Sequence, residues 1–292
     1  MSTMIVPACE EHGPDLARIC FEAFGRLQDR HGVARDFVSV DVAHMMVGMM
    51  LSRPDAAGFT AVDSASGRIL GSNFLLFSDA VAGVGPITVD PECQSKGVGR
   101  LLMLAVMEEA RRRRIEQVRL LQECINTTSL SLYAKLGFDW QDSCALMDPS
   151  TGDLQRRAST GAIRPMTEGD LDAVAAISKR QYHASRRNEV AACLRMQFPA
   201  FVLEDGSEVR GYFLPGLLGH GFAAEPGQLA DLVIHAGMHS PEMFHRVLVP
   251  LSENHLHREL LNRGCRTVKL MSYMTTGEFT RPVGAWVPCI GM

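Results

Sequence analysis

A glycine-bearing turn between a strand and a helix is the segment of this sequence best suited to bind a ligand. The predicted strand ends at Val89, Pro91 blocks its continuation, and Gly97 and Gly99 open a long amphipathic stretch. Glycine lets the backbone approach a ligand because it carries no Cβ. The first N–H groups of a helix have no partner within the helix, and the helix dipole adds partial positive charge there. The segment therefore predicts a pyrophosphate site, although a turn selected only for its backbone geometry has the same sequence pattern.

Two common phosphate-binding motifs do not fit this turn. A P-loop requires Gly-Lys-Ser/Thr, whereas Arg100 and Leu101 follow the second glycine here. A dinucleotide fingerprint requires a third glycine where the chain has Leu102, and the acidic residue it expects further on is not evident. What remains is Gln-x-x-Gly-x-Gly after a strand, running from Gln94 to Gly99.

A second motif follows the next predicted strand. It consists of Asn126, the small residue Ser129 three positions on, Tyr133 seven positions on, and then the pair Gly137-Phe138. A glycine at this place suits a left-handed helix stop. The two motifs, in this order, resemble motifs A and B of the GCN5-related N-acetyltransferases, the GNAT superfamily. The sequence departs from that pattern at Ser129, where alanine is commoner.

This resemblance implies an enzyme that binds acetyl-CoA as co-substrate, uses no metal, and moves an acyl group to a primary amine of a small molecule or peptide. The residues that it implies for acetyl-CoA binding are Ile87, Thr88, Val89, Gln94, Ser95, Lys96, Gly97, Val98, Gly99, Arg100, Asn126, Ser129 and Tyr133.

The same resemblance implies direct attack of the amine on the thioester, with a general acid for the leaving thiolate and donors for the oxyanion. Tyr133 is the candidate acid, because a phenol with a pKa near 10 is protonated at neutral pH and a thiol's pKa lies near 8.5. The alternative is a tyrosine that only packs its ring and hydrogen-bonds a carbonyl. The oxyanion donor implied is a main-chain N–H near Val89.

No general base is assigned. Glu123 lies late in a predicted strand, where it can face the cleft, point to solvent or pair with an arginine, and a short water chain is another route for the proton. Asn126 has two interpretations of equal weight, which are a hydrogen bond to the pantetheine arm and a cap on the following helix.

The elements that must position these residues follow from periodicity and turn signals. We expect strands at 59–63, 69–77, 81–89, 118–124 and 138–147, with helices at 96–114 and 127–136. This order predicts an α/β fold of α+β type, in which a central mixed sheet is flanked by helices.

The chain also contains a weak internal sequence repeat. Residues 5–19 resemble residues 163–177, and residues 69–75 resemble 209–214, in the same order. We therefore expect two GNAT-like domains, with a catalytic one at 1–150 and a degenerate one at 160–292, joined by a polar linker. In the second half, residues 230–237 are expected to form a strand that lacks the glycine motif. Its counterpart of the second motif, at 271–277, lacks the Asn-to-Tyr spacing.

Three other clusters favour structural roles. The run from Arg111 to Arg114 indicates a solvated helix end rather than a nucleic-acid site, since no aromatic residues are interleaved. The methionines at 45, 46, 49 and 50 indicate core packing. A metal site at His235 and His239 is disfavoured, because Gly237 and Pro241 make a shared helical face doubtful.

The bulk properties describe an ordinary globular protein of 292 residues, with 46% hydrophobic residues and a net charge of −4. They argue against nucleic-acid partners, and no stretch approaches the roughly 20 apolar residues of a membrane span. Eight scattered cysteines without a CxxC pair are expected to be reduced thiols of a cytoplasmic protein. A homodimer is compatible with the sequence. The rival function is a non-catalytic acyl-CoA-binding or sensing protein, or one whose second domain recruits a protein partner.

Overall fold

The computed structural model describes residues 2–149, 161–216 and 219–289. The elements of the first half are β1 (Thr3–Pro7), α1 (Gly13–His31), α2 (Val40–Ser52), β2 (Ala56–Asp63), β3 (Ile69–Leu76), β4 (Val81–Val84), β5 (Thr88–Val89), α3 (Val98–Arg112), β6 (Gln117–Glu123), α4 (Thr127–Lys135) and β7 (Asp139–Asp148). Those of the second half are β8 (Ala162–Pro165), α5 (Leu171–Tyr182), α6 (Arg187–Arg195), β9 (Phe201–Asp205), β10 (Glu208–Phe213), β11 (Gly221–Ala223), α7 (Pro226–His239), β12 (Val247–Pro250), α8 (Asn254–Asn262), β13 (Arg266–Thr276) and β14 (Ala285–Val287). The expected linker falls mostly on residues outside the described ranges.

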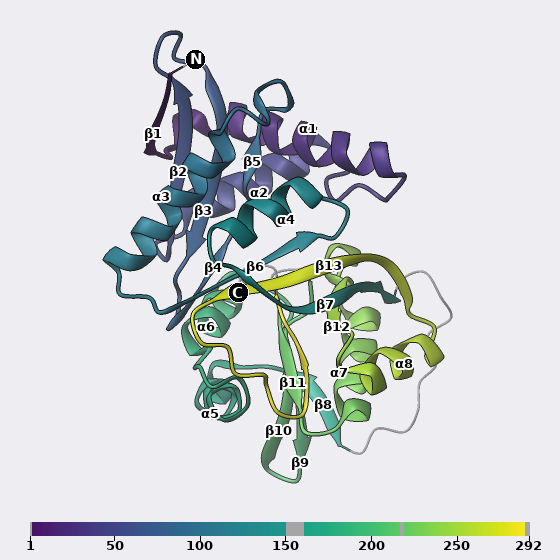
Figure 1. Cartoon of the computed structure of the whole chain (residues 1–292). Helices are drawn as coiled ribbons and strands as arrows, with labels where there is room; N and C mark the ends of the chain where they lie inside the picture. The colour runs from purple at the N-terminus through teal and green to yellow at the C-terminus, as the bar shows by residue number, and fades with distance from the viewer. Residues whose placement is uncertain (1, 150–160, 217–218, 290–292) are drawn as a thin grey trace.

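The larger sheet has the order β1-β2-β3-β4-β6-β13-β7-β12, and β5 pairs with β3. Strands β4 and β6 run parallel, whereas the other neighbours described in this sheet run antiparallel. The smaller sheet has the order β14-β11-β10-β9-β8. Helices cover both, which confirms the predicted mixed α/β fold (Figure 1).

Strand β13 joins the two halves of the chain. Although it comes from the second half, it lies between β6 and β7 and pairs antiparallel with both (Figure 1). Strand β7 in turn lies between β13 and β12, so each half contributes a strand to the other's sheet. A division into units at 1–150 and 160–292 follows the order of elements along the chain, but these units share a continuous sheet.

Helices pack on both faces of the first half's strands. On one face, α1 and α2 bury residues such as Leu16 and Val47 against Phe74 of β3. On the other face, α3 and α4 bury Val106 and Tyr133 against the opposite side of β3, β4 and β6. This two-sided packing fixes β3 to β6, which carry most of the candidate site.

The predicted strand at 81–89 is two strands. Gly85 has a φ of 135° and is followed by Pro86, which lacks an N–H to donate to a ladder. Strand β4 pairs with β3 and β6, whereas β5 pairs with β3 alone. The single predicted strand was wrong in this respect, and the break has a consequence for the site.

Two predictions for the second half were also wrong. Residues 230–237, expected as a strand, lie inside helix α7, which starts with Pro226 and a capping box between Glu225 and Gln228. Residues 271–276, expected to be the counterpart of the second motif, belong to strand β13. The repeated sequence segments do form corresponding elements. Strand β1 and helix α1 correspond to β8 and α5, and β3 corresponds to β10.

The histidine pair at 235 and 239 was expected not to share a helical face, and this was wrong as well. Both residues lie on α7, and their rings stack with centroids 4.1 Å apart. Within the described residues, no group of three or more His, Cys, Asp or Glu side chains is arranged to hold a metal ion. No described helix is long and apolar enough to cross a membrane.

The arginine run has the environment expected of it, whereas the expectation of core packing for the methionine cluster holds only in part. Helix α3 ends at Arg112, and Arg111 and Arg112 form exposed ion pairs with Glu108 and Glu109. Of the methionines on α2, Met50 is buried, whereas Met45 is exposed. No disulfide joins any of the eight cysteines, which all lie in the described ranges.

Candidate functional site

The site begins where β4 and β6 separate. Their parallel pairing runs through three registers and ends at the pair Gly83 and Arg119. After the break at Gly85, β5 follows β3 instead, so its other edge faces a gap toward β6. A wedge-shaped opening between the strands therefore starts beside Gly83 and Arg119.

The main chain of β5 points donors into this opening. Asp90 N–H donates to the carbonyl of Leu70 at 2.8 Å, so Asp90 and Thr88 face β3 in the antiparallel ladder. Val89, between them, faces the gap, and its carbonyl accepts a hydrogen bond from Gln94 Nε2 at 3.2 Å. The N–H of Val89 is thus directed into the gap, where an oxyanion donor was expected. Ile87, two residues before Val89, has the same place in the alternation of residues along the segment.

The turn beyond β5 leads into the N-terminus of α3. Gly97 is the N-cap with a φ of 88°, and Ser95 has a φ of 62°, so both use the left-handed region. The first bond of the helix runs from Leu101 N–H to Gly97 C=O at 3.1 Å, which leaves the N–H groups of Val98, Gly99 and Arg100 without helical partners. Residues 94–97 and Arg100 are exposed and Gly99 is half-buried, whereas Val98 is buried.

Gly99 lies between the turn and helix α4. A Cβ built on it would be 3.7 Å from Val89 Cγ2 and 3.7 Å from Leu132 Cδ2, with no clash against the protein. The space beside its backbone therefore has room for a methyl group between Val89 and Leu132. Together with the free N–H groups and the dipole, this space forms a cradle that fits a pyrophosphate.

Acidic residues at the turn are neutralised by Arg68. Its Nη2 donates to Asp90 at 2.7 Å and to Glu92 at 3.3 Å. Burial raises the pKa of Asp90, but the hydrogen bonds from Arg68 and from the N–H of Glu92, together with the positive charge of Arg68, offset this and hold the pKa below its usual value. Lys96 Nζ donates to the carbonyl of Glu92 at 2.8 Å. An anion at the start of α3 thus meets little uncompensated negative charge.

Helix α4 carries the second motif. Asn126 caps it, since its Oδ1 accepts the N–H of Ser129 at 3.1 Å, which is one of the two expected interpretations. Tyr133 is 4% exposed and packs with Phe138 at 6.2 Å between ring centroids. Burial raises the pKa of Tyr133 to about 12, against a smaller lowering by Ser129. The phenol is therefore protonated at any physiological pH.

Glu123 is neither exposed nor paired with an arginine. Its carboxylate forms an ion pair with Lys269 of β13, and its Oε1 accepts from Gln28 of α1 at 2.6 Å. Lys269 also binds Asp36 at 2.7 Å. The Oε2 atom of Glu123 is buried and has no hydrogen-bond partner in the described ranges. This cluster connects the two halves on the face of the sheet opposite α3.

With this geometry established, residues 26–138 match the model of the acetyltransferase (GNAT) family. This part of the first half is similar to the GNAT family. The match includes the glycine turn, the opening beside β6 and the motif on α4, so the features above lie inside the GNAT segment.

The curated relatives each match about a third of the chain or less. A mycothiol acetyltransferase of Saccharomonospora viridis is 35% identical over 94 residues, which cover 29% of this chain and 31% of that protein. The enzyme of the same name from Nocardia farcinica is 40% identical over 90 residues, 29% of this chain and 30% of that protein. The chain thus aligns with less than a third of the length of each of these relatives.

Solved structures extend the similarity of fold to the second half. A protein of Pyrococcus horikoshii superposes with a TM-score of 0.78, covering 99% of this chain and 94% of that one at 15% identity. A GCN5-related N-acetyltransferase of Sphaerobacter thermophilus superposes with a TM-score of 0.64, covering 96% of each chain at 15% identity. At such identities the likeness concerns the fold alone.

The second half differs from the GNAT segment at both motif positions. The helix that corresponds to α3 is α7, and its N-terminus is capped by the chain's own carboxylate, Glu225. The helix that corresponds to α4 is α8, which ends before Gly264 as α4 ends before Gly137. Counting back four residues from these glycines, buried Leu260 has the place of Tyr133. In the second half, a leucine therefore replaces the phenol of Tyr133, and a helix start capped by Glu225 replaces the open start of α3.

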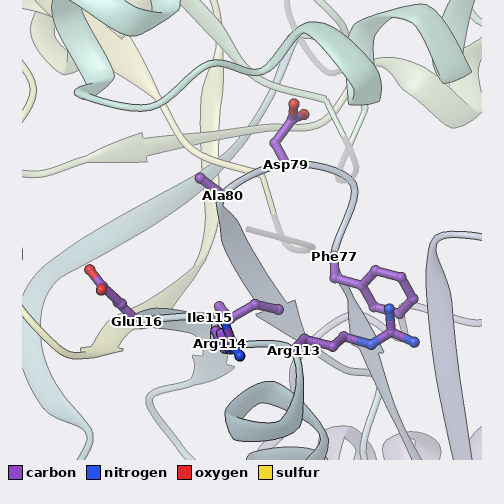
Figure 2. A pocket seen from close by; sticks show the side chains of 7 residues that line it. All are labelled: Phe77, Asp79, Ala80, Arg113, Arg114, Ile115 and Glu116. Carbon is purple, nitrogen blue, oxygen red and sulfur yellow. The ribbon is translucent and has the colours of Figure 1, made fainter.

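Two surface cavities lie away from the cradle. One, of about 410 Å³, is at the far end of α3, where Arg113 stacks on Phe77 with its Cζ 3.5 Å from the ring centroid (Figure 2). Because a helix rises about 1.5 Å per residue, the length of α3 separates this cavity from the cradle. The other, of about 540 Å³, lies between α2 and α6 and is lined by residues such as Arg53 and Asn188.

Several side chains of this region were not anticipated from the sequence. Lys269 of β13 reaches Glu123, and the aromatic residues Tyr182, Tyr273 and Trp286 pack near Leu121 of β6. One signal was available, namely Arg119 between the apolar residues Val118 and Leu120 of β6. Its partners come from far along the chain, and no local pattern identifies them.

Proposed function

We propose that the protein transfers an acetyl group from acetyl-CoA to a primary amine of a small molecule or peptide by direct attack. The observation that carries this proposal is the combination of an open, positively polarised helix start at Gly97 and Gly99 with the opening between β5 and β6. The first feature suits a diphosphate, and the second suits an extended arm that ends in a thioester. The similarity of residues 26–138 to the GNAT family supports both assignments.

The chain's own residues then have these roles. The N–H groups at the start of α3 bind the pyrophosphate, with Gln94, Ser95, Lys96 and Arg100 around it. The N–H of Val89, directed into the opening, donates to the oxyanion as charge develops on the carbonyl oxygen.

Further along the opening, the amide nitrogen of Asn126 is available to the pantetheine arm, because its oxygen is occupied by the cap. Tyr133 donates its hydroxyl hydrogen toward the leaving sulfur. With a pKa near 12 it always carries this proton, but it is a weaker acid than an ordinary phenol, so hydrogen-bond donation precedes full transfer.

We also propose that residues 1–150 hold acetyl-CoA and that residues 160–292 form a degenerate unit without a second acyl-CoA site. Glu225 at the start of α7 and Leu260 in the place of Tyr133 support the second part. The contribution of β13 to the sheet of the first unit gives this half a structural role.

The rival is an acyl-CoA-binding protein without turnover. It draws support from the deep burial of Tyr133 and from the ion pair that occupies Glu123, a carboxylate on the face opposite α3. Calorimetry with acetyl-CoA, followed by thiol release over a panel of amines and peptides, separates the two. Binding with turnover is expected. Binding without turnover on every amine selects the rival, and no binding removes both.

A further inference from the structure

A buried cation without a counter-ion lies beside the opening between β5 and β6. Arg119 of β6 is 3% exposed, and its Nε donates to Gln117 Oε1 at 2.8 Å. In the described part of the chain, no carboxylate lies within ion-pair distance of its guanidinium. Burying a charge in this way is costly unless something compensates it.

The position of Arg119 relates it to the reaction. It is the last residue of β6 in register with β4, so it marks the point where the opening begins. Because side chains alternate along a strand, Val118 and Leu120 face α3 and α4, whereas Arg119 and Leu121 face the other side. This is the side on which the second half of the chain covers the sheet (Figure 1).

Two further donors meet on that side. Arg186 Nη1 and the hydroxyl of Tyr273 are buried, and neither has a hydrogen-bond partner in the ranges that the structure describes. Tyr273 lies on β13 directly opposite Leu121, the β6 residue two places from Arg119. Arg186 is 1% exposed. Its Nε donates to Glu189 Oε2 at 2.8 Å, so one edge of the guanidinium is already hydrogen-bonded.

Aromatic rings connect these three groups. The ring of Tyr182 has Arg119 Cζ at 5.8 Å and Arg186 Cζ at 5.5 Å from its centroid. Phe279 lies 5.8 Å from Arg119 Cζ and 5.8 Å from the ring of Tyr273. The unused donors therefore belong to one aromatic cluster at the junction of the two halves.

The carboxylates of this cluster lie beside Arg186 rather than beside Arg119. Arg186 forms an ion pair with Glu189, and Asp79, which accepts the N–H of Glu189 at 3.1 Å, also interacts electrostatically with Arg186. Although burial raises the pKa of Glu189, Arg186 and His220 lower it to about 2, so this carboxylate is ionised. Burial and, next, Arg186 lower the pKa of His220 to about 4, so its imidazole is neutral. The guanidinium of Arg119 is therefore the one in this cluster that has no paired carboxylate within the described residues.

We propose that Arg119, Arg186 and Tyr273 bind a carboxylate of the acceptor, so that the acceptor is an amine carrying a carboxylate close to its reacting nitrogen, as an amino acid does. All three groups are hydrogen-bond donors, and the planar guanidinium matches a carboxylate in shape. A positive site also favours the neutral form of a neighbouring amine, which is the form that attacks. The proposal rests on the function proposed above and gives the second half a part in substrate recognition.

Binding tests the carboxylate site independently of turnover. The full-length protein, saturated with coenzyme A, is titrated calorimetrically with N-acetyl-amino acids of small, aromatic, acidic and basic type, and with the corresponding amides. We expect at least one acid to bind ten-fold or more tightly than its amide. The variant Arg119→Met should abolish that preference, whereas the control Arg111→Met, at an exposed helix end, should keep it.

Turnover then separates the two proposals. Acids that bind although no amine is acetylated would uphold the carboxylate site and remove the transferase function. Amines acetylated with equal kcat/KM whether or not they carry a carboxylate would overturn the site and leave the transferase standing. Acids that bind no better than their amides would also overturn it, whatever the activity.

The variant Tyr273→Phe adds a test in which a loss of affinity cannot be explained by a loss of folding stability. Its hydroxyl is buried without a partner, so its removal should leave the Tm unchanged or raise it. We expect the affinity for the preferred acid to fall at least three-fold at the same time. Unchanged affinity would exclude Tyr273 from the site.

Discussion

The substitution Gly99→Ala isolates the diphosphate cradle from the stability of the fold. Its methyl group would contact Val89 and Leu132 at 3.7 Å, an ordinary van der Waals distance, so no strain is expected in the free protein. Gly99 lies in the first turn of α3. Replacing glycine by alanine within a helix stabilises it by about 0.5–1 kcal/mol. For a chain of this size that corresponds to a rise in Tm of about 2 °C.

In the proposed site, the same methyl group crowds a diphosphate bound at the N–H groups of the first turn of α3. We therefore expect the Kd for coenzyme A, measured by calorimetry, to rise at least ten-fold, a loss of about 1.4 kcal/mol. Stability and affinity should move in opposite directions. A general defect of folding would lower both.

Gly48→Ala is the matched control. Gly48 also lies inside a helix, α2, and has no atom within 4 Å of a Cβ built on it. This variant should gain similar stability and keep the wild-type Kd. If Gly99→Ala bound coenzyme A as tightly as Gly48→Ala, the diphosphate would not lie at the start of α3, and the reasoning from the helix N-terminus would be wrong.

Three other perturbations test the site and the fold. Tyr133→Phe should lower kcat ten-fold or more at nearly constant Kd for acetyl-CoA. Because the raised pKa keeps the phenol protonated below about pH 12, the wild-type kcat should show no loss from Tyr133 between pH 7 and 10, and unchanged kcat in the variant would exclude it as the acid. Glu189→Gln should destabilise the protein by about 3–5 kcal/mol in denaturant unfolding, because it leaves the guanidinium of Arg186 buried without its partner. The depressed pKa of Glu189 means that its contribution is present above its ordinary value of 4.5 and disappears as the pH falls toward 2, so a flat stability profile over that window would contradict the pairing. A chain that ends at residue 265 lacks β13, which exposes the edges of β6 and β7, and it should be insoluble or aggregated in size-exclusion chromatography. A monodisperse folded product would show that the shared strand is dispensable.

Where the sequence predicted local structure correctly, the determining interactions lie within a few residues of one another. The turn from Val89 to Gly97, the start of α3 and the cap at Asn126 all depend on backbone geometry and hydrogen bonds of adjacent residues. Such features can be read from residue types at fixed spacing. Most strands and helices of the first half were predicted within a few residues for the same reason.

The errors arose where a local pattern has two solutions. An apolar run such as 230–237 fits a buried strand and a buried helix equally well by periodicity. The helix signals stood just before it, in Pro226 and the Glu225–Gln228 pair. Likewise, the break at Gly85 divided an apolar segment that reads as one strand.

The sequence alone determined that a glycine-bearing turn precedes a helix and that Tyr133 follows at the spacing of the second motif. Only the tertiary structure decided which residues surround the opening from the other side. Arg119 and Tyr273 meet through a strand inserted from the far end of the chain, as do Glu123 and Lys269. These pairings connect segments about 150 residues apart, and they depend on the order in which whole strands join the sheet rather than on any local preference.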